Sequence, residues 1–241
     1  MCGIIALLNN KTTFKKDLIK VAFDKLDSRG PEDSKEIYHS DKLYLGFKRL
    51  AINGLNEGSN QPIVINGVTL ICNGEIYNYR ELRNDLIKSG HKFSTESDVE
   101  VLVHLYEEYG YEAIHYLNGM FSFALFDSKK QILWIARDRI GIKPLYYAYR
   151  GDSFHFSSEL TGLAKILEAQ ISIKSVVDYL GYSYVPAPET IYEGIHKLMP
   201  GQEMILVEGK STLRSYWQCQ ISQEWNRGVD QAVEYLDELL K

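Results

Sequence analysis

The spacing of apolar residues changes several times along the chain, and each spacing predicts a different element. Residues 2–8 are almost continuously apolar, which predicts a buried strand beginning beside the amino terminus. Residues 14–26 carry apolar side chains at helical spacing, and residues 43–52 alternate loosely, as a strand does. The start of the chain therefore predicts a strand, a helix and a second strand.

Two short motifs predict helix starts in the next part of the chain. Residues 78–81 (NYRE) and 97–100 (SDVE) have the spacing of a capping box, in which side chains at both ends of the motif bond the first helical turn. They predict helices beginning at 78 and 97. A strand over residues 68–72 precedes the first helix, which places residues 73–75 in a connecting loop.

From residue 119 onward the apolar spacing falls to two, the period of strands. The expected order is two hairpins, a helix, a proline-containing connection, two more strands and a terminal helix, over residues 119–138, 144–158, 159–167, 181–201, 203–219 and 230–240. This order predicts an α+β fold in which helices cover two antiparallel sheets. The apolar stripe of the terminal helix suggests a missing continuation, although a helix docked on its own domain would show the same stripe.

Composition narrows the class of protein without changing this outline. The chain has 241 residues, 45% of them hydrophobic and 24% charged, and a net charge of −5, so collagen-like and disordered classes are excluded. A mildly acidic protein is not expected to bind nucleic acid, and no apolar run approaches the roughly 20 residues of a membrane span. Cys2, Cys72 and Cys219 lack metal-binding spacing, which favours a reducing, cytoplasmic location, with Cys72 and Cys219 packed in the interior.

Cys2 stands out because it follows the initiator methionine directly. Methionine aminopeptidase generally removes Met1 when a small residue follows, which would leave a thiol and a free α-amine on one residue. An α-amine has a pKa of about 7.7–8.0, so it can accept the proton of a nucleophile during acyl transfer. The alternative is that Cys2 is a small apolar residue packed in a terminal strand.

Other polar residues could supply the groups that attack on an amide requires. The Asn73 amide and the Gly74 N–H could stabilise an oxyanion, although an Asn-Gly pair is also a common turn. Arg49 could hold a carboxylate, and Glu75 and Asp98 could accept hydrogen bonds from an ammonium group. Asp98 could instead be an ordinary acidic residue at the start of a helix.

Together these motifs resemble the class II glutamine amidotransferase domain, an N-terminal nucleophile (Ntn) hydrolase, and in particular the glutaminase half of glutamine-hydrolysing asparagine synthetases. The similarity covers almost the whole chain in unbroken order. It rests on MCGI at 1–4, RGPED at 29–33, RLAI at 49–52, NQP at 60–62, NGEIYNY at 73–79, SDVE at 97–100, GMFSFA at 119–124, RDRIGIKPLYY at 137–147, FSSE at 156–159 and YVPAP at 184–188. Taken alone, the RGP sequence at 29–31 could be only a surface turn or could belong to the substrate-binding groups.

The resemblance implies a fold and a reaction. The fold is a four-layer αββα sandwich of two antiparallel sheets, the Ntn-hydrolase fold. In the reaction, Cys2 attacks the side-chain amide of L-glutamine and forms a γ-glutamyl thioester with release of ammonia, and water then releases glutamate. The resemblance implies no metal, no cofactor and no catalytic histidine for this step.

Individual residues of the chain match the family's site. The oxyanion hole corresponds to Asn73 and Gly74, and the group that binds the α-carboxylate corresponds to Arg49. The groups that bind the α-amine correspond to Glu75 and Asp98. The backbone that lines the glutamine pocket is expected from Leu50, Ala51, Ile52 and Asn53.

Two departures bear on the activity of the whole protein. The family usually has Gly-His-Arg-Arg-Leu where residues 46–50 read Gly-Phe-Lys-Arg-Leu, which alters the flank of the pocket but keeps Arg49. Asparagine synthetases continue into an ATP-pyrophosphatase domain whose phosphate loop does not occur in this sequence. We therefore expect an amidotransferase domain over residues 1–218, and a linker with the start of a truncated synthetase domain over residues 219–241. ATP and Mg²⁺ are expected only for the missing domain.

The resemblance also implies partners. These are L-glutamine and a synthetase domain in cis or in trans, and a homodimer is compatible with it. The family makes its inter-domain contact at the connection over residues 181–201, where an exposed apolar patch is expected. The preferred hypothesis is that ammonia passes to aspartate to form asparagine. Two alternatives stay open: another acceptor, such as a sugar in surface-polysaccharide synthesis, or a catalytically idle regulatory module.

Overall fold

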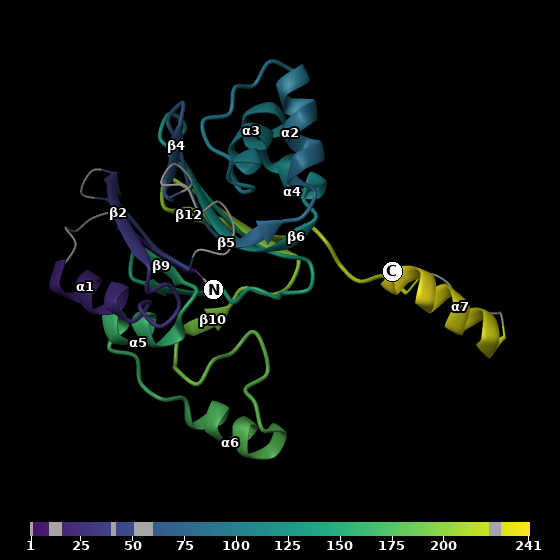
Figure 1. The fold of residues 1–241 in the computed structure, drawn as a ribbon. Coiled ribbons are helices and arrows are strands. Elements are labelled where there is room, and N and C mark those ends of the chain that lie inside the picture. Colours follow the sequence, from purple (N-terminus) through teal and green to yellow (C-terminus); the bar gives the residue numbers. More distant parts are fainter. Residues whose placement is uncertain (1, 10–15, 40–41, 51–59, 222–227) are drawn as a thin grey trace.

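The structure, a computed structural model, describes residues 2–9, 16–39, 42–50, 60–221 and 228–241. Two six-stranded sheets face each other, and helices cover their outer faces (Figure 1). The strand pairs in these residues are antiparallel. The predicted α+β fold with two helix-covered sheets is confirmed.

The first sheet has the strand order β10-β8-β9-β1-β3-β2, and the second has the order β12-β11-β7-β6-β5-β4. The strands of the first sheet are β1 Gly3–Asn9, β2 Asp33–His39, β3 Leu43–Arg49, β8 Tyr146–Arg150, β9 Ser153–Ser157 and β10 Ile195–Lys197. The strands of the second are β4 Ile63–Ile65, β5 Val68–Ile76, β6 Gly119–Asp127, β7 Ile132–Arg137, β11 Gln202–Val207 and β12 Lys210–Ser215. The helices of the described residues are α1 Lys16–Asp24, α2 Tyr79–Lys88, α3 Glu100–Tyr109, α4 Ala113–Tyr116, α5 Leu160–Leu167, α6 Ile173–Tyr182 and α7 Val229–Leu240, with a short 3-10 helix at Gly110–Glu112.

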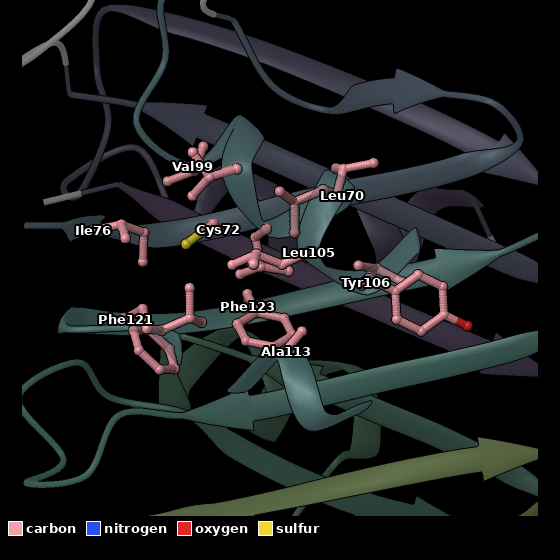
Figure 2. Close-up of a cluster of buried hydrophobic side chains, with 14 of the residues drawn as sticks. Leu70, Cys72, Ile76, Val99, Leu105, Tyr106, Ala113, Phe121 and Phe123 are labelled. Atoms are coloured by element: carbon pink, nitrogen blue, oxygen red, sulfur yellow. The ribbon is translucent and has the colours of Figure 1, made fainter. Parts of the chain in front are cut away.

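Side-chain alternation along the strands divides the core into layers. In β1, Ile4 packs between the sheets, whereas Ile5 packs against α1 and α5. In β5, Ile71 packs between the sheets, whereas Leu70 packs in a separate cluster against α3. Figure 2 shows that cluster, to which Phe123 of β6 contributes an aromatic ring. Odd or even position in a strand therefore decides which side chains can reach the space between the sheets.

The prediction of a loop at residues 73–75 is wrong. β5 continues through Ile76, and residues 73–75 pair with residues 120–122 of β6. The polar residues of this segment are therefore held by strand pairing, on a rigid part of the second sheet.

The two predicted capping boxes do not form, although helices begin close to both. The Asn78 side chain makes no bond to α2 and instead bonds the backbone of Tyr116 and Asn118. The Glu100 carboxylate bonds Ser94 and Thr95, and it does not close a capping box on α3. In both cases the polar side chains connect the helix to neighbouring segments.

The carboxyl-terminal part of the chain contains further differences from the predictions. Cys72 is buried as expected, but Cys219 is exposed. The helix α6 was not expected, and it buries only Ser175. The terminal helix α7 forms as predicted, buries none of its residues and lies apart from the sandwich (Figure 1). Among the described residues, no helix combines the length and apolar character needed to cross a bilayer.

Candidate functional site

Cys2 lies directly before β1, at one end of the first sheet. Its Sγ lies 3.6 Å from the Leu50 carbonyl oxygen, to which the thiol donates, and 3.5 Å from the Leu50 nitrogen. Leu50 follows the last residue of β3, so the end of the neighbouring strand holds the thiol. Cys2 is half-buried and packs against the core between the sheets. The predicted nucleophile therefore lies on the inner side of the first sheet.

Arg49 lies beside Cys2 on the same face of the first sheet. β1 and β3 are antiparallel, and extending their register by one step brings Cys2 opposite Arg49. Alternation gives Arg49 the same orientation as Phe47, which packs between the sheets. The Arg49 guanidinium bonds the Asn60 side chain, and Asn60 in turn bonds Asp33 on β2. The arginine is thus positioned at the end of β3 by a polar chain that crosses to the next strand.

Asn73 faces the same space from the second sheet. It lies two residues after Ile71, which packs between the sheets, so alternation directs both side chains to the same face. Only 1% of Asn73 is exposed, and its Nδ2 has no hydrogen-bond partner in the described residues. Ser122 of β6 lies opposite in register, and its buried hydroxyl is also unpartnered there. Because buried polar groups are nearly always bonded, the unpartnered amide indicates a place for an acceptor atom.

Gly74 directs its backbone N–H to the open edge of β5. In an antiparallel ladder the N–H and C=O of one residue point to the same side, and this side alternates along the strand. The backbone groups of Cys72 point away from β6 to the Gln61 side chain, and the Ile76 N–H points away from β6 to Asp98. Gly74, midway between them, has the same orientation. A β-carbon on Gly74 would lie 2.2 Å from a carbonyl oxygen of β6, so a larger residue does not fit.

Two carboxylates lie next to this edge. Glu75 alternates with Gly74 and therefore faces the space between the sheets. Asp98 precedes α3, and its Oδ2 accepts the Ile76 N–H at 2.8 Å. Burial raises the pKa of the Asp98 carboxyl, backbone hydrogen bonds oppose this rise, and the charge of Glu75 adds to it. A bound ammonium group would relieve the repulsion between these two carboxylates.

Burial and neighbouring charges shift the pKa values of the Cys2 and Cys72 thiols. Burial raises the pKa of the Cys2 thiol, and the charges of Arg49 and Lys143 offset part of this rise. Burial also raises the pKa of Cys72, to which the charges of Asp98 and Cys2 add. The Cys2 thiol is therefore protonated at neutral pH, and nucleophilic attack by it requires a base.

Two further residues belong to this environment and were not assigned from the sequence. The Arg29 side chain is 13% exposed and donates from Nε to the Cys2 carbonyl at 3.3 Å, so of the two alternatives left open for the RGP sequence, the surface turn does not apply. Arg29 also lies 3.9 Å from the Glu159 carboxylate. The other residue is Ser122, opposite Asn73. From the sequence, Ser122 could have been singled out as a polar residue in the middle of an otherwise apolar strand.

The structure brings together most of the residues predicted for the site. Those it describes are Cys2, Arg49, Leu50, Asn73, Gly74, Glu75 and Asp98. Ala51, Ile52 and Asn53 lie outside the described residues, so the pocket lining expected from them stays a prediction.

Comparison with known proteins identifies relatives of the chain. A family model for the glutamine amidotransferase domain matches residues 1–217. The chain is 36% identical over 227 residues to glutamine-hydrolysing asparagine synthetase 1 of Bacillus subtilis, covering 91% of this chain and 36% of that protein. It is 44% identical over 168 residues to the glutamine-hydrolysing asparagine synthetase of Sandersonia aurantiaca, covering 68% and 31%. The chain thus spans about a third of the length of these two relatives.

A solved structure supports the fold. The glutamine phosphoribosylpyrophosphate amidotransferase of B. subtilis, in complex with ADP and GMP, superposes with a TM-score of 0.68 at 19% identity, covering 90% of this chain and 50% of that chain. At this identity the similarity concerns the fold alone. It confirms the predicted Ntn-hydrolase sandwich.

Proposed function

The chain belongs to the glutamine amidotransferase domain family, and from that premise we propose that it hydrolyses the side-chain amide of L-glutamine to glutamate and ammonia. The observation that carries this proposal is the buried Asn73 Nδ2, which lacks a partner in the described residues and faces the side of Cys2. Leaving a buried donor unbonded costs about 1–3 kcal/mol. An idle regulatory module would gain nothing from an unbonded buried donor, whereas an oxyanion hole requires one.

In the proposed mechanism, Cys2 is the nucleophile and its own α-amine, freed by removal of Met1, is the base. As Sγ attacks the amide carbon, the amine accepts the thiol proton, and the carbonyl oxygen becomes an oxyanion. The Asn73 amide and the Gly74 N–H donate to that oxyanion. Transfer of the proton to the amide nitrogen breaks the C–N bond, releases ammonia and leaves a γ-glutamyl thioester.

The second half of the reaction regenerates the enzyme. The same amine accepts a proton from water as the water oxygen attacks the thioester carbon, and the same donors hold the oxyanion. The C–S bond then breaks, the Cys2 sulfur regains a proton and glutamate leaves. The raised pKa of the thiol supports a mechanism in which the proton moves during attack. We assign no metal or other cofactor to this step.

The proposal assigns substrate binding to residues at the ends of β3 and β5. Arg49 binds the α-carboxylate of glutamine, because a guanidinium can donate two parallel hydrogen bonds to a carboxylate. Glu75 and Asp98 bind the α-ammonium group. Arg49 lies on the first sheet, whereas Glu75 lies on β5 of the second sheet and Asp98 bonds the end of that strand, so the substrate would bridge the sandwich with its amide directed to Cys2.

For the whole protein we propose that the ammonia passes to aspartate in a synthetase domain that uses ATP and Mg²⁺, present in cis or in trans. The relatives named above support this assignment, since they are asparagine synthetases. An apolar surface on α6 also supports a partner, because Ile173, Val177 and Leu180 are 63–77% exposed next to the connection at residues 181–201. A cytoplasmic location is consistent with free cysteines, which Cys2, Cys72 and Cys219 all are.

The proposed hydrolysis is tested with a pair of cysteine variants. Cys2→Ala is expected to abolish the release of ammonia and glutamate from L-glutamine, while Cys219→Ala, at an exposed cysteine, retains it. Turnover by Cys2→Ala at the rate of the parent protein would refute the proposal.

The assignment of the base is tested separately by intact-mass measurement of the active protein. Met1 is expected to be absent from active molecules. Activity in a preparation that retains Met1 on every molecule would contradict the α-amine mechanism.

A further inference from the structure

A second cluster of chemically active side chains lies on the outer side of the second sheet, away from the space between the sheets. His104 and Glu107 are on α3, and His91 follows the end of α2. His104 is buried, and His91 is partly buried. These three residues take no part in the hydrolysis proposed above.

The ligand atoms of the cluster converge on one point. His91 Nδ1 and His104 Nδ1 are 3.2 Å apart, and Glu107 Oε2 lies 3.6 Å from the first and 3.3 Å from the second. A tetrahedral zinc ion with bonds of about 2.0–2.2 Å to nitrogen and oxygen holds its ligand atoms roughly 3.3–3.5 Å from one another. The three distances therefore match one face of such a tetrahedron.

The hydrogen bonds around the cluster assign lone pairs to all three converging atoms. His91 Nε2 lies 3.1 Å from Glu108 Oε2, and His104 Nε2 lies 3.4 Å from Glu100 Oε1. A carboxylate only accepts hydrogen bonds, so the tautomer with the proton on Nε2 satisfies both of these carboxylates and leaves a lone pair on each Nδ1. The Glu100 carboxylate also accepts hydrogen bonds from the backbone N–H groups of Ser94 and Thr95, so its oxygens act as acceptors toward His104.

Glu107 is oriented in the same way. Its Oε1 accepts a hydrogen bond from the Asn66 side chain at 2.8 Å, which directs Oε2 to the two histidines. With the ring protons on Nε2, three acceptor atoms face one another, and a cation bound among them would satisfy all three. Metal-binding histidines characteristically donate their other ring N–H to a carboxylate or carbonyl group, as both histidines do here.

The surroundings select the kind of cation. The cluster borders a surface cavity of about 660 Å³, which leaves room for water or a small anion as a fourth ligand. Lys92, Lys129 and Lys130 line the same cavity. Asp127 also lines it and pairs with Lys130. Mg²⁺ and Ca²⁺ prefer oxygen ligands, of which the cluster offers only one. Two imidazoles and one carboxylate instead favour a borderline transition metal, which forms strong bonds to nitrogen.

We propose that His91 Nδ1, His104 Nδ1 and Glu107 Oε2 bind one divalent transition-metal ion of the zinc type. The ion ties the segment after α2 to the middle of α3. Its second layer of contacts includes Glu100, whose carboxylate also holds the backbone of Ser94 and Thr95. The site therefore stabilises the helical layer that covers β5, and metal binding is expected to raise the temperature of unfolding.

The proposal is tested by titrating the full chain, free of any affinity tag, with Co²⁺ and Zn²⁺. A Cys2→Ser background removes the thiol next to the amino terminus as a competing ligand. We expect one equivalent of Co²⁺ to give the visible absorption bands of a tetrahedral site without a thiolate charge-transfer band, and Zn²⁺ to displace it. Absence of stoichiometric binding would overturn the proposal.

Substitutions locate the site. His91→Ala and Glu107→Gln are expected to weaken binding at least tenfold, and Glu108→Gln to weaken it roughly 10–100-fold through the lost second-layer bond. Glu112→Gln is the matched control, since Glu112 pairs at 3.7 Å with an exposed histidine outside the cluster. Circular dichroism establishes that each variant is folded. Unchanged affinity in folded His91→Ala, or equal loss in Glu112→Gln, would place the metal elsewhere and refute the assignment.

Discussion

Replacing Asn73 by alanine is expected to separate catalysis from stability. Removing one oxyanion donor typically lowers kcat about 10²–10³-fold, equivalent to about 2.7–4 kcal/mol of transition-state stabilisation. The substrate clamp proposed above consists of other residues, so KM for glutamine should change little.

The expected loss of stability follows from the missing hydrogen bond. Because Nδ2 has no partner in the described residues, its removal breaks no bond there and relieves an unsatisfied buried donor. The space vacated, roughly 30 Å³, costs about 0.7 kcal/mol at about 24 cal/mol per Å³. The free energy of unfolding of Asn73→Ala should therefore lie within about 1 kcal/mol of that of the parent protein.

Gln61→Ala is the matched comparison, because Gln61 is a buried amide next to Cys72, the residue before Asn73. Its side chain bonds both the N–H and the C=O of Cys72. Removing it leaves two buried backbone groups without these partners, at about 1–3 kcal/mol each, so a loss of roughly 2–6 kcal/mol is expected.

Urea denaturation measures the free energy of unfolding of both variants, and a coupled assay for glutamate measures kcat and KM. The reasoning would be refuted in either of two ways. One is a kcat of Asn73→Ala above a tenth of the parent value, and the other is a loss of stability as large as that of Gln61→Ala.

Three more predictions concern other parts of the fold and the site. Gly74→Ala should destabilise the protein and abolish activity, because its β-carbon would lie 2.2 Å from a backbone oxygen of β6. Gly181→Ala, in α6 with open space around it, should leave the free energy of unfolding in urea unchanged or raise it. Equal effects of the two substitutions would contradict the packing argument. Arg49→Lys should raise KM for glutamine roughly 10–150-fold in steady-state kinetics. A lysine cannot form the bidentate bond to a carboxylate, and its loss costs about 1.5–3 kcal/mol of binding free energy. An unchanged KM would refute the assignment of Arg49 to carboxylate binding. Burial lowers the pKa of His155 to about 4 from 6.5. Between these two pH values the unfolded chain takes up a proton that the folded chain excludes. The free energy of unfolding therefore falls as the pH drops from about 6.5 to about 4, by roughly 3 kcal/mol at about 1.36 kcal/mol per pH unit. His155→Leu should flatten this part of the curve of unfolding free energy against pH and His115→Leu should not, so identical curves would refute the assignment.

Much of the site could be predicted from the sequence because its residues belong to short contiguous motifs. Cys2 is set apart by its position after Met1, and the orientations of Arg49, Asn73 and Glu75 follow from two-residue alternation once their strands are known. The loop predicted at residues 73–75 shows the limit of such reasoning. Asn, Gly and Glu are poor strand formers, but pairing with β6 outweighs their local preference.

The sequence by itself determined the sandwich of two sheets and the family, and it predicted Cys2 as the nucleophile, because strand and helix periods and short motifs are properties of neighbouring residues. Only the tertiary structure decided which polar groups meet. The Gln61 side chain bonds Cys72, Glu100 bonds Thr95, and His91 meets His104 across 13 positions of the chain. Hydrogen-bond partners and converging lone pairs depend on which distant segments the fold brings within about 3 Å, and no local pattern of residues encodes that distance.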